Sequence, residues 1–399
     1  MNVLLVGKGS KNYPSTVGNI ISNIVDSPTF RDDYFFVLCA KSKFTTNLKG
    51  QNFEHLEYED YVITHKESDK RLSLLARFVY FIRKAFTYIY SHLIIDYDHL
   101  SFLLARRKAY RLCKNIKVDC VLGMAGVFSS FDLAHFLAKK LGVALVLYYF
   151  DVFSPDIMLT GNHRFAVKKE SKWQESAKAI LMPRSYKLLY SQSGFDTRKY
   201  VDCLFPSFLR TGYTKREKTQ GKDLVYAGGF YDKIREPDEF LMIAKRFVQL
   251  GYRVVCYGQS QKAMIRKFGP SPLYDNVIWK TTLAYDDLIA VLGEAAALIN
   301  IENKYGIRFP SKMLQYLGFG KLIINLNAGR KQVREYLDKE YEQIISSNDY
   351  YKTINDQSGV AQYLEGVIKM IDTPFAPVLL NDDITMDIRK VLLDVLASK

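Results

Sequence analysis

The sequence predicts an α/β protein built from two doubly wound parallel sheets. Short apolar runs rich in Val, Ile, Leu, Tyr and Phe alternate with segments of helical period, which is the pattern of βαβ units. The pattern occurs twice, before and after a charged segment near the middle of the chain. A length of 399 residues also exceeds one core of ordinary size and favours two domains.

The first predicted domain, residues 1–210, contains six candidate buried strands. Each is a run of four to seven mostly apolar residues, and helical patterns lie between most neighbours. The runs cover residues 2–7, 34–39, 119–124, 144–150, 179–182 and 201–205. Right-handed crossovers between such strands give a doubly wound sheet.

The second predicted domain, residues 222–378, repeats the pattern after a linker at residues 207–222 that is dense in charge and lacks an apolar period. Its strands are expected at residues 223–229, 253–258, 277–280, 297–302, 321–327 and 342–346, with helices at 236–250, 285–294 and 311–319. Residues 379–399 follow a segment rich in helix breakers and contain a last helix, at 383–396. We expect this helix to cross back and pack on the first domain.

Positive charge is concentrated in the first half. The chain has 56 Lys and Arg residues against 42 Asp and Glu, a net charge of +14. Such a balance attracts polyanions, namely nucleic acid, anionic membrane or phosphorylated substrates. Residues 1–210 carry 30 basic and 19 acidic side chains, whereas residues 211–399 carry 26 and 23. The excess therefore belongs to the N-terminal half.

Much of this excess lies in residues 71–117, which have ten basic and two acidic side chains. Over residues 71–90 the apolar side chains fall on one helical stripe, formed by Leu75, Phe78, Ile82, Phe86 and Ile89. Three interpretations remain open for the helical segments expected in residues 71–117. They could pack in the protein core, lie on an anionic membrane, or form a nucleic-acid groove with tyrosines as stacking platforms.

The cysteines and histidines indicate neither disulfides nor a metal site. The five cysteines are scattered without a CxxC pair, and the six histidines lack HExxH spacing. A reducing cytoplasm fits this pattern. No uncharged apolar run reaches the roughly 18–20 residues that cross a bilayer, so we expect a protein that is soluble or lies on a membrane without spanning it.

The most informative motif covers residues 309–325. Pro310 and Ser311 mark the start of a helix, Gly318 and Gly320 mark its end, and a buried strand follows. Lys312 falls in the first turn, where its ammonium group and the unpaired backbone N–H groups would converge. Such a helix start can hold a phosphate group.

This motif resembles the P-S-K-x-x-E-Y-x-x-x-G-K-P-[VI]-I pattern of the retaining, family 4-like GT-B glycosyltransferases that build bacterial surface polysaccharides. Residues 224–237 are similar to the glycine-rich G-x-x-x-x-x-[RK] segment of that family. Residues 151–156 resemble its D-[LIV]-[WF]-P-[DE] turn, with one residue inserted before the proline. The resemblance implies two Rossmann-like domains that face a cleft containing the active site.

The resemblance also implies how the donor diphosphate is bound. Arg235 and Lys312 would neutralise the departing nucleoside diphosphate, and Ser311 would donate a hydrogen bond to it. Gly228 and Gly229 would bring the backbone close to the donor. In this family the diphosphate needs no metal, and we expect no metal or other cofactor.

The expected nucleoside site has two parts. Main-chain groups near Lys280 and Thr281 would hold the base, and Gln315 would meet the ribose. Gln315 replaces the acid that family members usually carry, and Leu322 replaces their proline. A carboxamide can still form a hydrogen bond with a ribose hydroxyl.

The expected acceptor site lies on the first domain. Asp151, after a predicted strand, is the candidate catalytic residue. It would be the base if the reaction inverts configuration, and would only orient the acceptor if the reaction retains it. Gly9 and Ser10 follow the first strand in a G-x-G pattern that lacks the third glycine of a dinucleotide-binding loop. Together with Asp156, they are expected to line the acceptor cleft.

The implied function is transfer of a sugar from a nucleotide-sugar donor to a glycan acceptor, lipid-linked, in capsule or O-antigen biosynthesis. With this resemblance, membrane contact by residues 71–117 is preferred over nucleic acid, and the expected location is the cytoplasm, at the inner face of the cell membrane. Two alternatives stay open. One is a nucleotide-sugar epimerase of the same fold, and the other is a non-catalytic protein that binds polyanions or nucleic acid.

Overall fold

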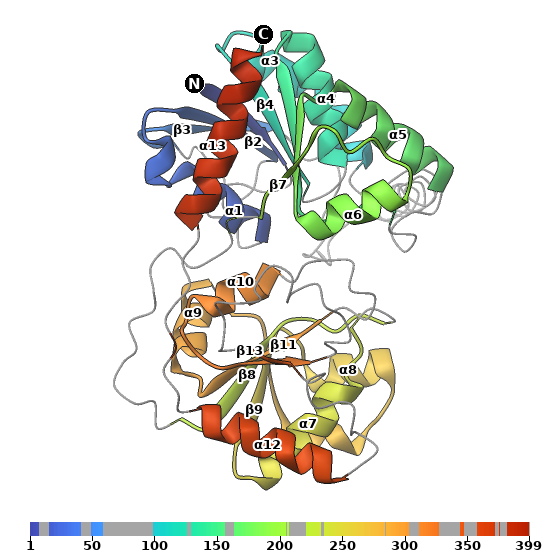
Figure 1. Cartoon of the computed structure of the whole chain (residues 1–399), viewed down its shortest axis with the longest axis vertical. Helices are drawn as coiled ribbons and strands as arrows, with labels where there is room; N and C mark the ends of the chain where they lie inside the picture. The colour runs from blue at the N-terminus through green and yellow to red at the C-terminus, as the bar shows by residue number, and fades with distance from the viewer. Residues whose placement is uncertain are drawn as a thin grey trace, which may run out of the picture. The chain divides into compact units, whose positions relative to one another are not determined.

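The computed structural model describes residues 1–7, 16–40, 49–58, 99–125, 129–155, 163–204, 206, 221–232, 235–283, 285–302, 311–326, 344–346, 357–371, 375 and 381–398. The chain divides into two compact units. One consists of Met1–Pro206 with Asn381–Lys399, and the other of Ser207–Leu380. Each unit contains one sheet with helices on both faces (Figure 1).

The first unit has a seven-stranded parallel sheet in the order β3-β2-β1-β4-β5-β6-β7. Its strands are β1 (Asn2–Val6), β2 (Tyr34–Ala40), β3 (Phe53–Tyr58), β4 (Cys120–Ala125), β5 (Ala144–Tyr149), β6 (Ala179–Met182) and β7 (Tyr200–Asp202). All six residues of β5 are buried, as expected for a strand covered on both faces. The strand order reverses between β1 and β4, so a crevice is expected at their carboxyl ends.

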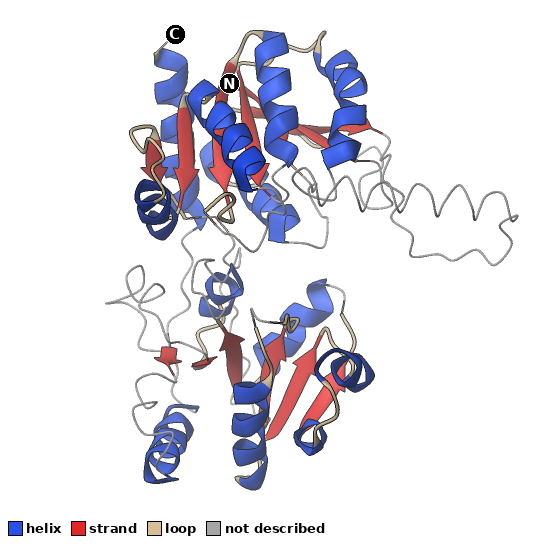
Figure 2. Cartoon of the chain, turned by 90° about the vertical axis from the view of Figure 1, so that its right-hand side faces the viewer, coloured by secondary structure: helices blue, strands red, loops and turns tan. Residues whose placement is uncertain are grey.

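Helices cover both faces of this sheet (Figure 2). The face with Tyr149 is covered by α3 (His99–Cys113), α4 (Ser129–Leu141), α5 (His163–Ser176) and α6 (Arg184–Gln192), and the other by α1 (Thr16–Val25) and α13 (Asn381–Ala397). Helix α4 approaches the sheet closely at Gly123 of β4. A Cβ atom at this position would lie 2.8 Å from the Cβ of Ala134, so a glycine is required there.

The last helix, α13, belongs to the first unit. Its buried residues include Ile384, Ile388 and Leu392. Arg389 contacts Asp33 through its Nε at 2.8 Å, and this pairing joins the helix to the N-terminal part of the chain. The short 3-10 helix η1 (Pro28–Phe30) is a further contact of α13.

The second unit has a six-stranded parallel sheet in the order β10-β9-β8-β11-β12-β13. Its strands are β8 (Asp223–Ala227), β9 (Arg253–Tyr257), β10 (Val277–Lys280), β11 (Ala297–Ile301), β12 (Ile323–Leu326) and β13 (Ile344–Ser346). One face packs on α7 (Asp238–Gln249), α8 (Gln261–Phe268) and α12 (Gln357–Ile371), whose apolar residues form one core cluster with the strands. Among the described residues of this unit, the other helices are α9 (Tyr285–Glu294), α10 (Ser311–Leu317) and the 3-10 helix η2 (Pro272–Asn276).

The predicted pair of doubly wound parallel sheets is confirmed, with one strand missed. Strand β3 was not predicted because its sequence, FEHLEY, is half polar and contains no continuous apolar run. It lies at the edge of the sheet, where Glu54 and Glu57 are tolerated. The helix predicted at residues 71–90 lies outside the described residues, whereas the basic stretch that follows it forms α3. No helix in the described part of the chain is long and apolar enough to span a membrane.

Candidate functional site

The candidate site lies in the second unit, where the strand order reverses between β8 and β11. The loops that follow β8, β9 and β10 are joined there by backbone hydrogen bonds. The N–H of Gly228 donates to the carbonyl of Tyr257 at 2.9 Å, and that of Gly258 donates to the carbonyl of Lys280 at 3.0 Å. Ligands of open α/β sheets bind at this kind of position.

Lys312 reaches this edge from α10. Its Nζ donates a hydrogen bond to the carbonyl of Ala227, the last residue of β8, and lies 5.9 Å from the centroid of the Tyr226 ring. A Cβ atom on Gly228 would lie 2.6 Å from the Tyr226 hydroxyl and 2.7 Å from this Nζ, so a side chain there would displace these groups. Because an ammonium has three N–H donors, Lys312 can hold Ala227 and still donate to an anion.

Arg235 approaches the same place through Tyr226. Its Nη1 lies 3.5 Å from the Tyr226 hydroxyl, which itself donates to the carbonyl of Gly229 at 3.0 Å. The Tyr226 ring packs against Phe230 and Phe240 at centroid distances of 5.2 and 5.5 Å, which fixes its position. The structure therefore brings together Gly228, Gly229, Arg235 and Lys312, as the sequence motifs suggested.

The charges of the site are held in a buried setting. Burial, followed by the charge of Arg235, lowers the pKa of Lys312 from 10.5 to about 8. Burial also raises the pKa of Tyr226 and of Cys256 to about 12 each, so both stay neutral at physiological pH. Two cations beside the glycine pair, of which Gly228 is buried and Gly229 half-buried, form a site suited to an anion, because an anion offsets the unfavourable burial of positive charge.

Several residues of this edge were not predicted from the sequence. Gly258 has a φ of 101°, and a Cβ there would lie 3.3 Å from the carbonyl oxygen of Gly228. Near Gly229, a Cβ would meet the hydroxyl of Tyr231 at 3.1 Å and Nε2 of Gln259 at 3.2 Å. The sequence signal for Gly258 was its place at the end of the strand predicted at residues 253–258.

The predicted nucleoside residues are less closely joined to this centre. Lys280 and Thr281 are exposed at the end of β10, two strands away from β8. Gln315 is half-buried in α10, one turn after Lys312. Ser311 begins α10, but its side chain lies outside the described residues.

A buried polar row lies on β11 and β12, next to β8 in the sheet. Asn300 Nδ2 donates to Asn325 Oδ1 at 2.7 Å, and Asn325 Nδ2 donates to Glu302 Oε1 at 2.8 Å. Burial raises the pKa of Glu302 from 4.5 to about 7, against the lowering effect of the Asn325 hydrogen bond. Glu302 was expected only as the last residue of the strand at 297–302, so its burial is a finding of the structure.

In the first unit, Asp151 lies two residues after the end of β5 and is half-buried. The turn that it begins is held by helix side chains. The Tyr186 hydroxyl donates to the carbonyl of Phe150 at 3.1 Å, and the Tyr190 hydroxyl accepts from the N–H of Phe153 at 3.0 Å. The other predicted acceptor residues, Gly9, Ser10 and Asp156, lie outside the described residues.

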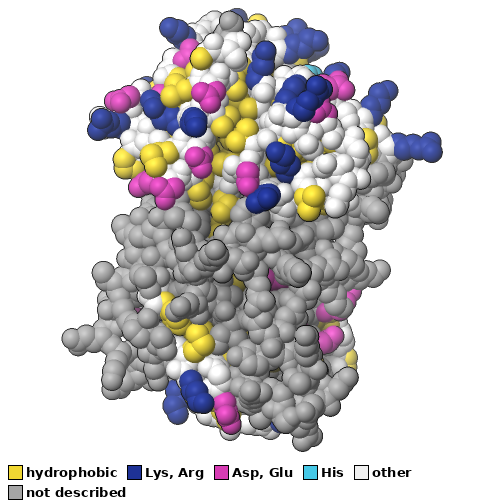
Figure 3. Space-filling model, in the orientation of Figure 1, with side chains coloured by type: hydrophobic (Ala, Val, Ile, Leu, Met, Phe, Trp, Pro, Cys, Tyr) yellow, Lys and Arg dark blue, Asp and Glu magenta, His cyan; other side chains and the backbone are white. Residues whose placement is uncertain are grey.

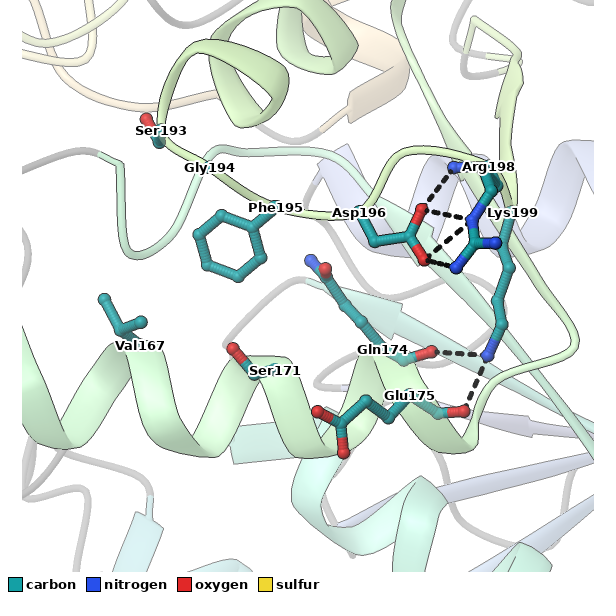
Figure 4. Close-up of a pocket in the computed structure, with 10 residues that line it drawn as sticks. All are labelled: Val167, Ser171, Gln174, Glu175, Ser193, Gly194, Phe195, Asp196, Arg198 and Lys199. Atoms are coloured by element: carbon teal, nitrogen blue, oxygen red, sulfur yellow. Dashed lines mark hydrogen bonds and ion pairs between the residues drawn. The ribbon is translucent and has the colours of Figure 1, made fainter.

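A surface pocket of about 430 Å³ lies elsewhere in the first unit, between α5 and residues 193–199 (Figure 4). Its cations are engaged within the protein. Arg198 pairs with Asp196 at 2.7 Å, and Lys199 Nζ donates to the backbone carbonyls of Gln174 and Glu175 at 3.3 and 2.6 Å. The pocket lies where α5 ends and β7 begins, at the amino ends of the strands. It therefore does not belong to the edge where Asp151 lies.

No family model and no curated protein sequence matches the chain. Solved structures do match over nearly its whole length. HepE of Anabaena, in complex with UDP and glucose, is 12% identical with a TM-score of 0.60, covering 98% of this chain and 99% of that chain.

Two further structures are similar over the same extent. The lipopolysaccharide outer core galactosyltransferase WaaB, in its apo form, is 15% identical with a TM-score of 0.52 over 98% of this chain and 100% of that chain. A UDP-N-acetylglucosamine 2-epimerase is 12% identical with a TM-score of 0.53 over 100% and 96%. These likenesses, together with the two Rossmann-like sheets, show that the chain has the GT-B fold.

Proposed function

We propose that the protein is a glycosyltransferase that takes its sugar from a nucleotide-sugar donor. One observation supports this most strongly. The ammonium group of Lys312 and the guanidinium group of Arg235 converge on Gly228 and Gly229 at the β8/β11 edge. A nucleoside diphosphate is the ligand that fits two cations beside glycine backbone at a strand-order reversal.

The similar structures support a nucleotide-sugar ligand. The HepE structure contains UDP and glucose, and WaaB is described as a galactosyltransferase. Both share the fold of this chain along almost their entire length. The proposed donor is therefore a nucleoside diphosphate sugar.

In the proposed reaction the bond between the sugar C1 and the diphosphate breaks while C1 bonds to an acceptor oxygen. Lys312 and Arg235 stabilise the negative charge that develops on the departing diphosphate, without a metal. We propose that configuration is retained. The acceptor proton then passes to the leaving diphosphate, and Asp151 orients the acceptor hydroxyl.

The proposal is tested by thermal unfolding with UDP-, GDP-, dTDP- and CMP-linked sugars. One of these should raise the melting temperature of the wild type but not that of a Lys312→Met variant. The matched control is Lys321→Met, because Lys321 is also buried and donates to a backbone carbonyl, that of Ala295 at 2.7 Å, at the opposite edge of the sheet. Failure of every donor, or equal loss of stabilisation in both variants, would reject the site.

We further propose that the acceptor is lipid-linked and that the first unit contacts an anionic membrane, as in assembly of a bacterial surface polysaccharide. Helices α3, α4 and α5 contain ten basic residues and three acidic ones. Of the three acids, Asp132 and Glu170 are buried, and only Glu175 is exposed. Lysines and arginines lie on the surface of this unit in the view of Figure 3, and each basic residue near an anionic membrane contributes about 1 kcal/mol.

Flotation with liposomes tests the membrane contact. A variant with Arg107, Arg111, Lys168 and Lys172 changed to Gln should lose binding to anionic vesicles. A control variant changes exposed basic residues of the second unit instead, on α7 and α8, namely Lys245, Arg246, Lys262 and Arg266. Equal flotation of the two variants, or binding of neutral vesicles to the same degree, would reject the proposed surface.

An epimerase is the second candidate, because a UDP-N-acetylglucosamine 2-epimerase shares the fold. Incubation of the stabilising nucleotide sugar without an acceptor separates the two functions. An epimerase converts it to the epimer, which proton NMR detects directly. A transferase leaves it unchanged or releases the sugar slowly to water.

A further inference from the structure

The turn that begins with Asp151 is held by a fully buried carboxyl group. Glu170, on α5, is 0% exposed. Its Oε2 accepts hydrogen bonds from the backbone N–H of Ser154, at 3.0 Å, and from the Ser154 hydroxyl. Its Oε1 accepts from the Tyr190 hydroxyl, which in turn accepts from the N–H of Phe153 at 3.0 Å. One network thus fixes two consecutive N–H groups of the turn.

The donors around Glu170 match a carboxylate better than a carboxylic acid. Three N–H or O–H groups, from Ser154 and Tyr190, point at its two oxygens. An ionised carboxyl group only accepts hydrogen bonds and can satisfy all three. A protonated group loses its negative charge and places its own hydrogen on one oxygen, so the hydrogen bonds that it accepts are weaker and the new O–H competes with the donors for space.

We propose that Glu170 is a positioning residue, which fixes residues 151–155 through Ser154 and Tyr190 and releases this turn when it gains a proton. The link to activity rests on the proposed function, in which Asp151 orients the acceptor. The effect on the turn itself does not depend on that function. The two parts can therefore be tested separately.

The titratable groups that face Glu170 are tyrosines, which stay neutral near pH 7. Tyr149 of β5, Tyr190 of α6 and Tyr200 of β7 surround it, and burial raises the pKa of each well above the ordinary value of 10. Gln174 joins two of them, since it donates to Tyr149 at 3.1 Å and accepts from Tyr200 at 2.7 Å. Burial raises the pKa of Glu170 itself from 4.5 to about 7, although its hydrogen bonds act in the opposite direction.

A tryptophan provides a built-in reporter of the turn. Trp173 stacks on Phe153, with ring centroids 6.0 Å apart and an interplanar angle of 30°. The chain contains only two tryptophans. Labelling with 5-fluorotryptophan therefore gives two ¹⁹F resonances, and a Trp279→Phe variant assigns them.

The first test follows the Trp173 resonance from about pH 5.5 to 8.5. In the wild type it should shift with a midpoint near 7, as the pKa of Glu170 predicts. In Glu170→Gln the shift should be absent, whereas Glu175→Gln, on the same helix but exposed, should keep it. His135 is retained in every variant, so its own titration contributes equally to all. An unchanged titration in Glu170→Gln would overturn the proposal.

The second test measures turnover with the nucleotide sugar that the thermal panel identifies. Glu170→Gln should lower kcat by roughly 10- to 100-fold at pH 8, as expected for a displaced reacting group, and leave the donor KM within about twofold because the donor residues lie in the other unit. The wild-type rate should also fall below pH 7, and that fall should be missing in the variant. If Glu170→Gln does not fold, Tyr190→Phe removes one contact of the same network and should displace the Trp173 resonance.

The outcomes separate the two proposals. A Trp173 resonance that responds as expected, without any nucleotide-sugar turnover, would reject the proposed function and leave the positioning role. Turnover that is unaffected in kcat and pH profile by Glu170→Gln would reject the positioning role and leave the proposed function.

Discussion

Affinity for a nucleoside diphosphate should fall steeply with rising pH, because Lys312 loses its proton near pH 8. Burial and the nearby Arg235 lower the pKa of its ammonium group from 10.5 to about 8. A bound diphosphate stabilises the charged form and raises this pKa. Above pH 8 the free protein must therefore take up a proton in order to bind, and the apparent affinity decreases.

The size of the effect follows from this pKa. If Lys312 keeps its proton in the complex at every pH, the Kd should rise about 25-fold between pH 7.5 and 9.5. This change corresponds to about 2 kcal/mol of binding free energy, at roughly 1.4 kcal/mol for each tenfold change in Kd. The neighbouring Tyr226 and Cys256 do not contribute, because burial raises the pKa of each to about 12.

Isothermal titration calorimetry with UDP, or with whichever diphosphate the thermal panel identifies, measures the effect. Lys312→Met should bind weakly with a Kd that changes little over this range. Lys321→Met should keep the wild-type pH dependence, since its lysine contacts Ala295 at the other edge of the sheet. A wild-type Kd that does not change with pH, or a Kd that rises as much with pH in Lys312→Met, would show that Lys312 is not the group responsible.

Three further predictions concern binding and stability. Gly228→Ala places a Cβ 2.7 Å from Lys312 Nζ. By displacing this charged donor it should raise the Kd for the diphosphate, measured by calorimetry, roughly 10- to 100-fold. The control Gly221→Ala, whose Cβ meets only a carbonyl at 3.4 Å, should leave the Kd unchanged. Gly123→Ala places a Cβ 2.8 Å from a Cβ of α4, and urea unfolding should show a loss of about 1–3 kcal/mol. Burial raises the pKa of Glu302 from 4.5 to about 7, so the folded state binds this proton more tightly than the unfolded chain. The free energy of unfolding should therefore decrease as pH rises from 4.5 through 7, and urea unfolding of Glu302→Gln should lack that share of the decrease.

The sheets were predictable because their strands are covered on both faces. β5, β6, β8, β9 and β11 were expected within two residues of their observed ends, since a parallel strand buried on both faces reads as a continuous apolar run. The helices α9, α10 and α13 were also found from their apolar period. β3 was missed because this edge strand has no continuous apolar run, and its pairing with the predicted strand β2 is visible only in the fold.

Only those residues of the candidate site that belong to a recognisable sequence motif could be predicted. Lys312 and Gly228 were found through separate motifs, but their contact across 84 positions of the chain depends on β8 and α10 meeting at one edge. Tyr226, inside a buried strand, could not be distinguished from a core residue. The same holds for Glu170, whose role depends on contacts between α5, α6 and the turn after β5.

A crystal structure with the nucleoside diphosphate bound would show where the phosphate groups lie. Phosphate oxygens should lie within about 3.2 Å of Lys312 Nζ and of the backbone N–H of Gly229, at the β8/β11 edge of the second sheet. A diphosphate bound instead at the β1/β4 edge of the first sheet, with Lys312 making no contact to it, would rule out the proposed donor site.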